Sequence, residues 1–155
     1  MDSTQRSTKG AILLALLALV LAPATTSACS CTEWPSFMQA YVQSQAIFRG
    51  TVTGIRSAAP TYYGQIWVTL QVGHSWKGEV PATVEILTGE NEAMCGFTFV
   101  VDSEYLVYAL PYGEELSTDL CWRTHLLFPG DPDLVLLETV PTMPQAWSLV
   151  KSLYR

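Results

Sequence analysis

The chain has 155 residues, which is the length of one domain built around a single hydrophobic core. Its 8 Lys and Arg residues against 14 Asp and Glu give a formal net charge of −6, and the basic residues form no run or stripe. These properties argue against a second domain and against nucleic acid or heparin-like polyanions as partners.

Residues 1–28 have the pattern of a signal peptide. A run of twelve apolar residues follows a basic amino-terminal stretch and precedes a proline and several small residues. A membrane-spanning helix needs about 20 apolar residues, so this run is too short to cross a bilayer. We expect cleavage after Ala28, which makes Cys29 the first residue of a single exported domain, 29–155.

The predicted mature domain is expected to be secreted, either outside the cell or into a periplasm. It loses Arg6, Lys9 and Asp2, so 6 Lys and Arg remain against 13 Asp and Glu, a net charge of −7. A cysteine directly after a cleavage site is also typical of a bacterial lipoprotein. Thr26 argues against lipidation of Cys29, because lipoprotein sites usually have leucine there. A membrane partner is expected only if Cys29 is lipidated.

All four cysteines lie in the mature domain, at Cys29, Cys31, Cys95 and Cys121. An even number in an exported chain predicts a framework of two disulfides. A bridge between Cys29 and Cys31 would close a strained ring, which leaves two pairings, and each ties the amino terminus to the body of the domain. Zinc binding by the cysteines is not expected, because the spacing does not fit and oxidation removes the thiolates.

A short helix is expected first in the mature domain, within residues 32–45. Phe37, Tyr41 and Val42 lie at helical spacing after a Pro-Ser start. The chain then becomes rich in β-branched and aromatic residues, which predicts five strands at 46–55, 65–72, 83–88, 105–110 and 116–122.

The predicted strands favour an all-β fold with flanking helices, in which the five strands close into a barrel. Closure removes the exposed sheet edges of short strands. The second strand alternates as a half-buried strand does, with one face formed by Ile66, Val68, Leu70 and Val72. A carboxy-terminal helix over 143–154 is expected to pack against the barrel through Trp147, Val150 and Tyr154.

The sequence shows no catalytic motif. His74 and His125 have no histidine partner at metal-site spacing, and we interpret them as surface or packing residues. The acidic pairs at 114–115 and 131–133 are interpreted as solvent-exposed loops with at most weak affinity for calcium. The protein is therefore not expected to be an enzyme or to have a cofactor of its own.

Several short motifs follow one another along the mature chain: Cys29-Ser30-Cys31-Thr32, Phe48-Arg49-Gly50-Thr51-Val52, Trp76-Lys77-Gly78, Met94-Cys95-Gly96, Tyr105-Leu106-Val107-Tyr108 and Cys121. In this order they resemble the amino-terminal, netrin-like domain of the tissue inhibitors of metalloproteinases. The resemblance covers about residues 29–121 and is most specific at the Cys-Ser-Cys start. It implies a five-stranded barrel of the oligonucleotide/oligosaccharide-binding (OB) type, with the disulfides Cys29–Cys95 and Cys31–Cys121.

The resemblance also implies an inhibitory ridge, made of Cys29, Ser30, Cys31, Thr32, Glu92, Ala93, Met94 and Cys95. In such a ridge the α-amino group and carbonyl oxygen of Cys29 chelate the catalytic zinc of a protease and displace the attacking water. Ser30 enters the specificity pocket beside the zinc. The implied function is a secreted, monomeric inhibitor of zinc metalloendopeptidases, with the zinc supplied by the target protease.

Two departures from this family keep other functions open. The chain has too few cysteines for the third bridge of the family's first domain, and it shows no cysteine-rich second domain. Netrin-like domains that do not inhibit proteases share the same fold. A non-inhibitory protein-binding module is therefore the main alternative, and a lipid-anchored envelope protein is a further one.

Overall fold

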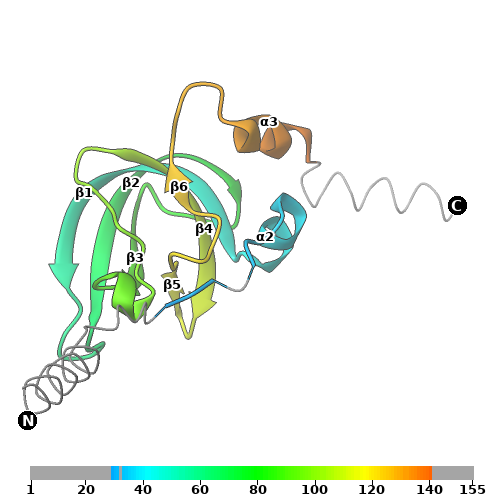
Figure 1. The fold of residues 1–155 in the computed structure, drawn as a ribbon. Helices are drawn as coiled ribbons and strands as arrows, with labels where there is room; N and C mark the ends of the chain where they lie inside the picture. The colour runs from blue at the N-terminus through cyan, green and yellow to red at the C-terminus, as the bar shows by residue number, and fades with distance from the viewer. Residues whose placement is uncertain (1–28, 32, 141–155) are drawn as a thin grey trace, which may run out of the picture.

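The computed structural model describes residues 29–31 and 33–140. The predicted signal peptide, Thr32 and the predicted helix over 143–154 lie outside the described residues. Within the described ranges the chain is mostly β-sheet with two α-helices, α2 and α3 (Figure 1). In that part of the chain, no helix has both the length and the apolar character that a membrane crossing requires.

Helix α2 (Phe37–Gln43) forms where the sequence predicts a short helix. The hydroxyl of its N-cap, Ser36, accepts a hydrogen bond from the backbone N–H of Gln39, and the Gln39 side chain accepts one from the Ser36 N–H. This reciprocal pair satisfies amide groups that a helix start leaves unpaired. At the other end, the Lys77 ammonium donates to two carbonyl oxygens of the last turn, where its charge complements the helix dipole.

Six strands lie in the described part of the chain: β1 (Ala46–Ser57), β2 (Gln65–Lys77), β3 (Thr83–Gly89), β4 (Glu104–Tyr112), β5 (Glu115–Ser117) and β6 (His125–Leu126). β1 pairs antiparallel with β2 and β4, and β2 pairs antiparallel with β3. β5 pairs in parallel with β3 and antiparallel with β4, so the strands β1-β2-β3-β5-β4 form a ring. β6 adds to β4.

The predicted strands are present, but several of their boundaries differ. β1 and β2 continue to Ser57 and Lys77 because they pair with each other over most of their length. The register between them shifts at irregularities of the β-bulge kind, so the pairing continues past them. The predicted strand over 116–122 is reduced to β5. The chain leaves the sheet after Ser117, where the Thr118 hydroxyl bonds to the hydroxyl of Thr124 at 2.7 Å.

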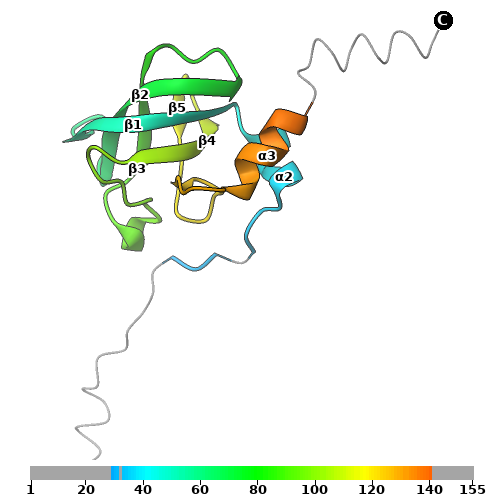
Figure 2. The ribbon, with the colours of Figure 1, turned by 90° about the horizontal axis from the view of Figure 1, so that it is seen from above.

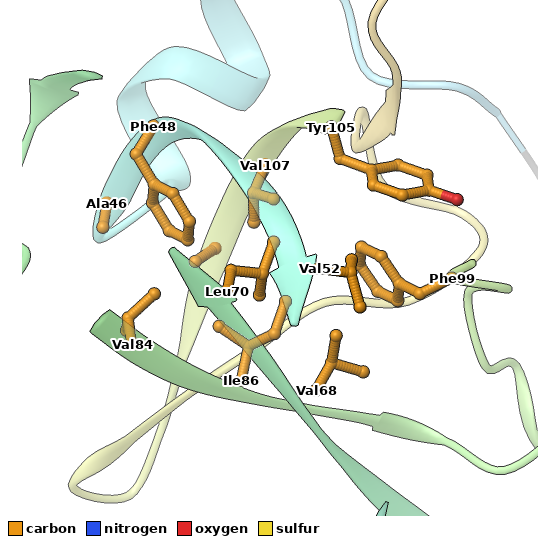
Figure 3. Close-up of a cluster of buried hydrophobic side chains, with 11 residues drawn as sticks. Ala46, Phe48, Val52, Val68, Leu70, Val84, Ile86, Phe99, Tyr105 and Val107 are labelled. Atoms are coloured by element: carbon orange, nitrogen blue, oxygen red, sulfur yellow. The ribbon is translucent and has the colours of Figure 1, made fainter. Parts of the chain in front are cut away.

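The main hydrophobic core lies inside the ring of strands (Figure 3). Its buried members come from every long strand and from the loop before β4: Ala46, Phe48, Val52, Val68, Leu70, Val84, Ile86, Phe99, Tyr105, Val107 and Ala109. The predicted apolar face of β2 is confirmed, because Ile66 and Val72 pack against this cluster. Alternate residues of β1 and β4 point inward, as the period of a strand requires.

A second core lies between the ring and the helices. Figures 1 and 2 show α2 and α3 (Pro132–Thr139) together on one side of the ring. The outward residues Ile47, Leu106 and Tyr108 are fully buried there, with Ala40 from α2 and Leu137 from α3. β4 is thus buried on both faces, which explains its nearly continuous run of apolar residues.

The acidic stretch 131–133 is not a solvent-exposed loop, so that interpretation is wrong. Asp131 and Asp133 are only 1% and 2% exposed, because this stretch begins α3. The Asp131 carboxylate is the N-cap and accepts a hydrogen bond from the backbone N–H of Asp133. Pro132 stands in the first turn, where a missing N–H costs nothing.

Candidate functional site

Two disulfides hold the amino-terminal segment against one end of the ring. They join Cys29 to Cys95 and Cys31 to Cys121, with Cα atoms 5.4 and 5.3 Å apart. This is the pairing that the resemblance implies. No cysteine is left as a thiol, and two disulfides in one domain fit an oxidising compartment.

The segment that receives Cys29 is a tight turn after β3. The 3-10 helix η1 (Glu92–Met94) is followed by Cys95 in the left-handed conformation, with φ +57°. The N–H of Gly96 donates to the carbonyl oxygen of Asn91 at 2.9 Å and closes the turn. A Cβ on either Gly89 or Gly96 would collide with the backbone of the other segment, so glycine is needed where the turn folds back on β3.

The segment that receives Cys31 is braced against the same turn. The N–H of Leu120 donates to the carbonyl oxygen of Cys95 at 2.9 Å. The Asp119 carboxylate accepts a hydrogen bond from the N–H of Cys121 at 2.8 Å. The two attachment points of the amino terminus are therefore linked directly to each other as well as to the sheet.

The inhibitory ridge residues that the structure describes come together around the Cys29–Cys95 bond. Ser30, Glu92, Ala93 and Met94 are exposed, and the bonded cysteines are half-buried. Thr32 is the ridge residue that lies outside the described residues. These exposed residues flank a segment that is covalently tethered at Cys29 and Cys31.

The loop between β1 and β2 supports this surface, although the sequence did not indicate it. The Met94 side chain lies directly on Gly64, whose carbonyl oxygen accepts a hydrogen bond from the N–H of Glu90 at 2.9 Å. Tyr62 packs edge-on against Trp67 and Tyr112, which holds the loop in place. The sequence of this loop does not reveal the contact with Met94, because β2 and β3 lie between the two residues in the chain.

A buried polar cluster beneath α3 is the other concentration of titratable groups. The Tyr108 hydroxyl donates to Asp133 at 2.8 Å, and Arg123 donates to both Asp133 oxygens at 2.6 and 2.7 Å. His125 lies 2.7 Å from Asp131 through Nε2, and 2.7 Å from the Arg123 carbonyl oxygen through Nδ1. Both imidazole nitrogens are hydrogen-bonded within the protein, so His125 helps to hold the beginning of α3 in place.

The electrostatics of this cluster follow from burial and pairing. Burial alone would raise the pKa of Asp133, but hydrogen bonds from Arg123 and Tyr108 outweigh it and hold that pKa below the usual value. The same carboxylate raises the pKa of Arg123, and burial next to it raises the pKa of Tyr108. The lowered pKa of Asp133 and the raised pKa of Arg123 both favour the charged forms of this pair.

Within residues 29–31 and 33–140, no three His, Cys, Asp or Glu side chains are grouped as a metal site would require.

No family model and no curated protein matches this chain.

Proposed function

We propose that the protein is a secreted inhibitor of zinc metalloendopeptidases that binds its target through the inhibitory ridge. The observation that carries the proposal is the Cys29–Cys95 bond, which holds the first residue of the proposed mature chain against η1. We also propose that the ring of strands is a closed OB-type barrel of the netrin-like kind. The order of the motifs and the disulfide pairing support the likeness to tissue inhibitors of metalloproteinases.

The chemistry of inhibition requires an open position on the target's zinc. A catalytic zinc in a protease has three protein ligands and a water molecule, and that water attacks the substrate. The α-amino nitrogen and the carbonyl oxygen of Cys29 form a five-membered chelate when they replace the water. An α-amino group has a pKa near ~8, so the metal has to displace at most one proton.

Tethering of the chain end lowers the cost of binding. A terminus of a few residues is usually disordered, and ordering it on binding costs about 0.5–1.5 kcal/mol for each immobilised side chain. Here Cys29 and Cys31 are both bonded to the body of the domain before any target arrives. Ser30 is exposed between them, so its small hydroxyl side chain is available to the pocket beside the zinc.

Addition of one alanine before Cys29 tests the proposal. The added residue converts the Cys29 amine into an amide, which has no affinity for zinc, and it shifts the chain end away from the metal. We expect the inhibition constant against a susceptible zinc endopeptidase to rise by at least about 100-fold, or about 2.8 kcal/mol. The matched control carries one alanine after Arg155.

Both variants are first checked for an unchanged thermal midpoint and for both disulfides by peptide mapping. Equal inhibition by the two variants would rule out chelation by the amino terminus and would favour a netrin-like module that binds through another surface. Intact mass and amino-terminal sequencing of the exported product complete the test. A lipid on Cys29, or a start at another residue, would exclude the mechanism.

A further inference from the structure

The face of α3 that points away from the ring is apolar, although it is exposed. Asp133, Leu134 and Leu137 face the ring, since Asp133 and Leu137 are buried and Leu134 packs on the second core. Val135 and Leu136 lie away from the ring, where they are 64% and 40% exposed. From Leu134 to Leu137 the helix is apolar all round, which is typical of a helix that is covered on every side.

A cavity of about 460 Å³ adjoins the beginning of α3. Pro132 lines it, together with Leu126 and Phe128 from the preceding segment and Trp34 from the amino-terminal segment. Leu126, Phe128 and Trp34 are 53%, 52% and 63% exposed. The charged side chains in the lining are already paired with one another in the buried cluster beneath α3. What the cavity offers to an occupant is therefore mainly apolar surface.

The segment that follows α3 has the sequence of an amphipathic helix. Thr142 and Gln145 have the spacing of a capping box, and Pro144 falls in the first turn of the helix predicted over 143–154. Ser148 lies on the polar side of this predicted helix. Apolar residues recur at helical spacing on the other side: Met143, Ala146, Trp147, Val150, Leu153 and Tyr154. A helix with such an apolar side needs an apolar surface to cover it.

The connection and the lengths favour an antiparallel pair of helices. α3 ends at Thr139, so residues 140–142 separate it from the predicted helix. Connections of about 2–5 residues are typical of antiparallel helix pairs. At about 1.5 Å per residue, α3 is about 12 Å long and the predicted helix about 18 Å, so the second helix would run about 6 Å past the beginning of α3. Its last turn would then reach the cavity beside Pro132.

Charge and tethering favour this segment over other occupants. It contains Lys151 and Arg155 and no acidic residue, whereas residues 29–140 carry 4 Lys and Arg against 13 Asp and Glu. Opposite charges favour association of the segment with the rest of the domain, and the negative charge of the domain disfavours an anionic membrane surface. A short connection also gives the segment an effective concentration in the millimolar range, which a second copy does not reach in dilute solution.

We propose that residues 143–154 fold back as a helix antiparallel to α3 and cover its outward apolar face. Trp147 then lies against Leu136, and Tyr154 enters the cavity beside Pro132. The surface that receives the segment is thus α3, whereas the sequence alone favoured packing on the barrel itself. The proposal does not depend on the proposed function, because the inhibitory ridge takes no part in it.

NMR of the full mature chain with isotope-labelled leucine and valine methyl groups tests this placement. We expect nuclear Overhauser effects between the Leu136 methyl groups and the Trp147 indole, and between the Leu126 methyl groups and the Tyr154 ring. Trp147→Ala should shift the methyl signals of Val135 and Leu136, because it removes the ring that covers them. Ser148→Ala, on the polar side of the segment, is the matched control and should leave these signals in place.

A pair of introduced cysteines gives a second measurement. Leu136→Cys with Ala146→Cys places two thiols on the facing sides of the helices, and a short bifunctional maleimide should join them within one molecule. Leu136→Cys with Ser148→Cys is the matched control, which should react far less because Ser148 points away from α3. Peptide mapping first confirms that both native disulfides are intact in each variant.

A monomer that shows both sets of Overhauser effects and selective cross-linking of the Ala146 pair supports the proposal. Absence of these effects, or equal cross-linking of the two pairs, would overturn it. A dimer in sedimentation would assign the face of α3 to a second copy. Cosedimentation of the wild type, but not of Trp147→Ala, with vesicles that contain phosphatidylglycerol would assign the segment to a membrane surface, and either result would overturn the proposal as well.

Discussion

Asp133→Asn measures what the buried cluster beneath α3 contributes to stability. Asp133 is 2% exposed and accepts three hydrogen bonds, from the Tyr108 hydroxyl and from two nitrogens of Arg123. Asparagine keeps the shape, but it removes the charge and turns an amide N–H₂ toward one of these donors. Breaking a buried ion pair by removing one partner costs about 3–5 kcal/mol, so we expect a loss of that size in the free energy of unfolding.

The matched control is Glu85→Gln, which makes the same chemical change in an exposed pair. Arg56 and Glu85 also form a two-point ion pair, but their side chains are 55% and 41% exposed. Such surface pairs contribute about 0–1 kcal/mol. Urea unfolding at pH 7 should show a midpoint about 2 M lower for Asp133→Asn, for a slope near ~2 kcal/mol/M, and almost no change for Glu85→Gln. Equal small losses in both variants would refute the argument from burial.

The difference between wild type and Asp133→Asn should also depend on pH. Because the folded protein holds the pKa of Asp133 below its ordinary value of 3.8, ionisation stabilises the fold above that pH. The contribution is lost as the pH falls through the lower, folded pKa. Unfolding curves between pH 5 and pH 2 should therefore converge. A difference that stays constant over this range would mean that the charge of Asp133 contributes little.

Two further changes test the support of the inhibitory ridge. Gly96→Ala places a methyl group on the backbone of Gly89 and should cost about 1–3 kcal/mol in the free energy of thermal unfolding. Gly54→Ala is the control, because its methyl group meets only Thr69 at ordinary contact distance, and its effect should stay within about 0.5 kcal/mol. The double change Cys31→Ser and Cys121→Ser removes the disulfide that joins residues 90 positions apart in the sequence. It should lower the free energy of unfolding in urea by about 2–4 kcal/mol. If the unfolding midpoint of Gly96→Ala or of the double cysteine variant stayed unchanged, the close approach of Gly96 to Gly89 or the disulfide, respectively, would not stabilise the fold as argued.

The long strands were predictable because their pattern is local. In β2, alternate residues face the ring interior, so a period of two appears directly in the sequence, and the structure buries the predicted face. Helix α2 was also predictable from its local pattern, since Phe37 and Tyr41 pack on the second core. Val42 of the predicted face is instead 66% exposed, and the fully buried residue of the helix is Ala40. The short strand β6 pairs only His125 and Leu126 with β4, which is too little to leave a pattern.

The beginning of α3 could not be predicted by the same reasoning. A stretch of Asp-Pro-Asp is usually exposed, and nothing nearby offsets the cost of burying two carboxylates. For Asp133 the offsetting groups are Tyr108 and Arg123, which lie 25 and 10 residues earlier. For Asp131 they are His125 and the backbone N–H of Asp133. Only the folded chain brings them together, so a composition rule gives the wrong answer here.

The amino-terminal site shows the same division between local and distant information. The number and compartment of the cysteines predicted two disulfides, but spacing alone left two pairings, and the order of the motifs was needed to choose between them. The contact of Met94 with Gly64 had no sequence signal. It depends on the register of β2 with β3, which pairs Gln65 with Gly89.

The disulfide connectivity also sets an order of events during biosynthesis. Cys29 and Cys31 are synthesised first, but their partners follow 66 and 90 residues later. By the time Cys95 leaves the ribosome, the residues of β1, β2 and β3 have all been made. The first two thiols therefore have no correct partner until the later cysteines have been made. A nascent or truncated chain that stops before Cys95 carries Cys29 but has nothing to hold it in place.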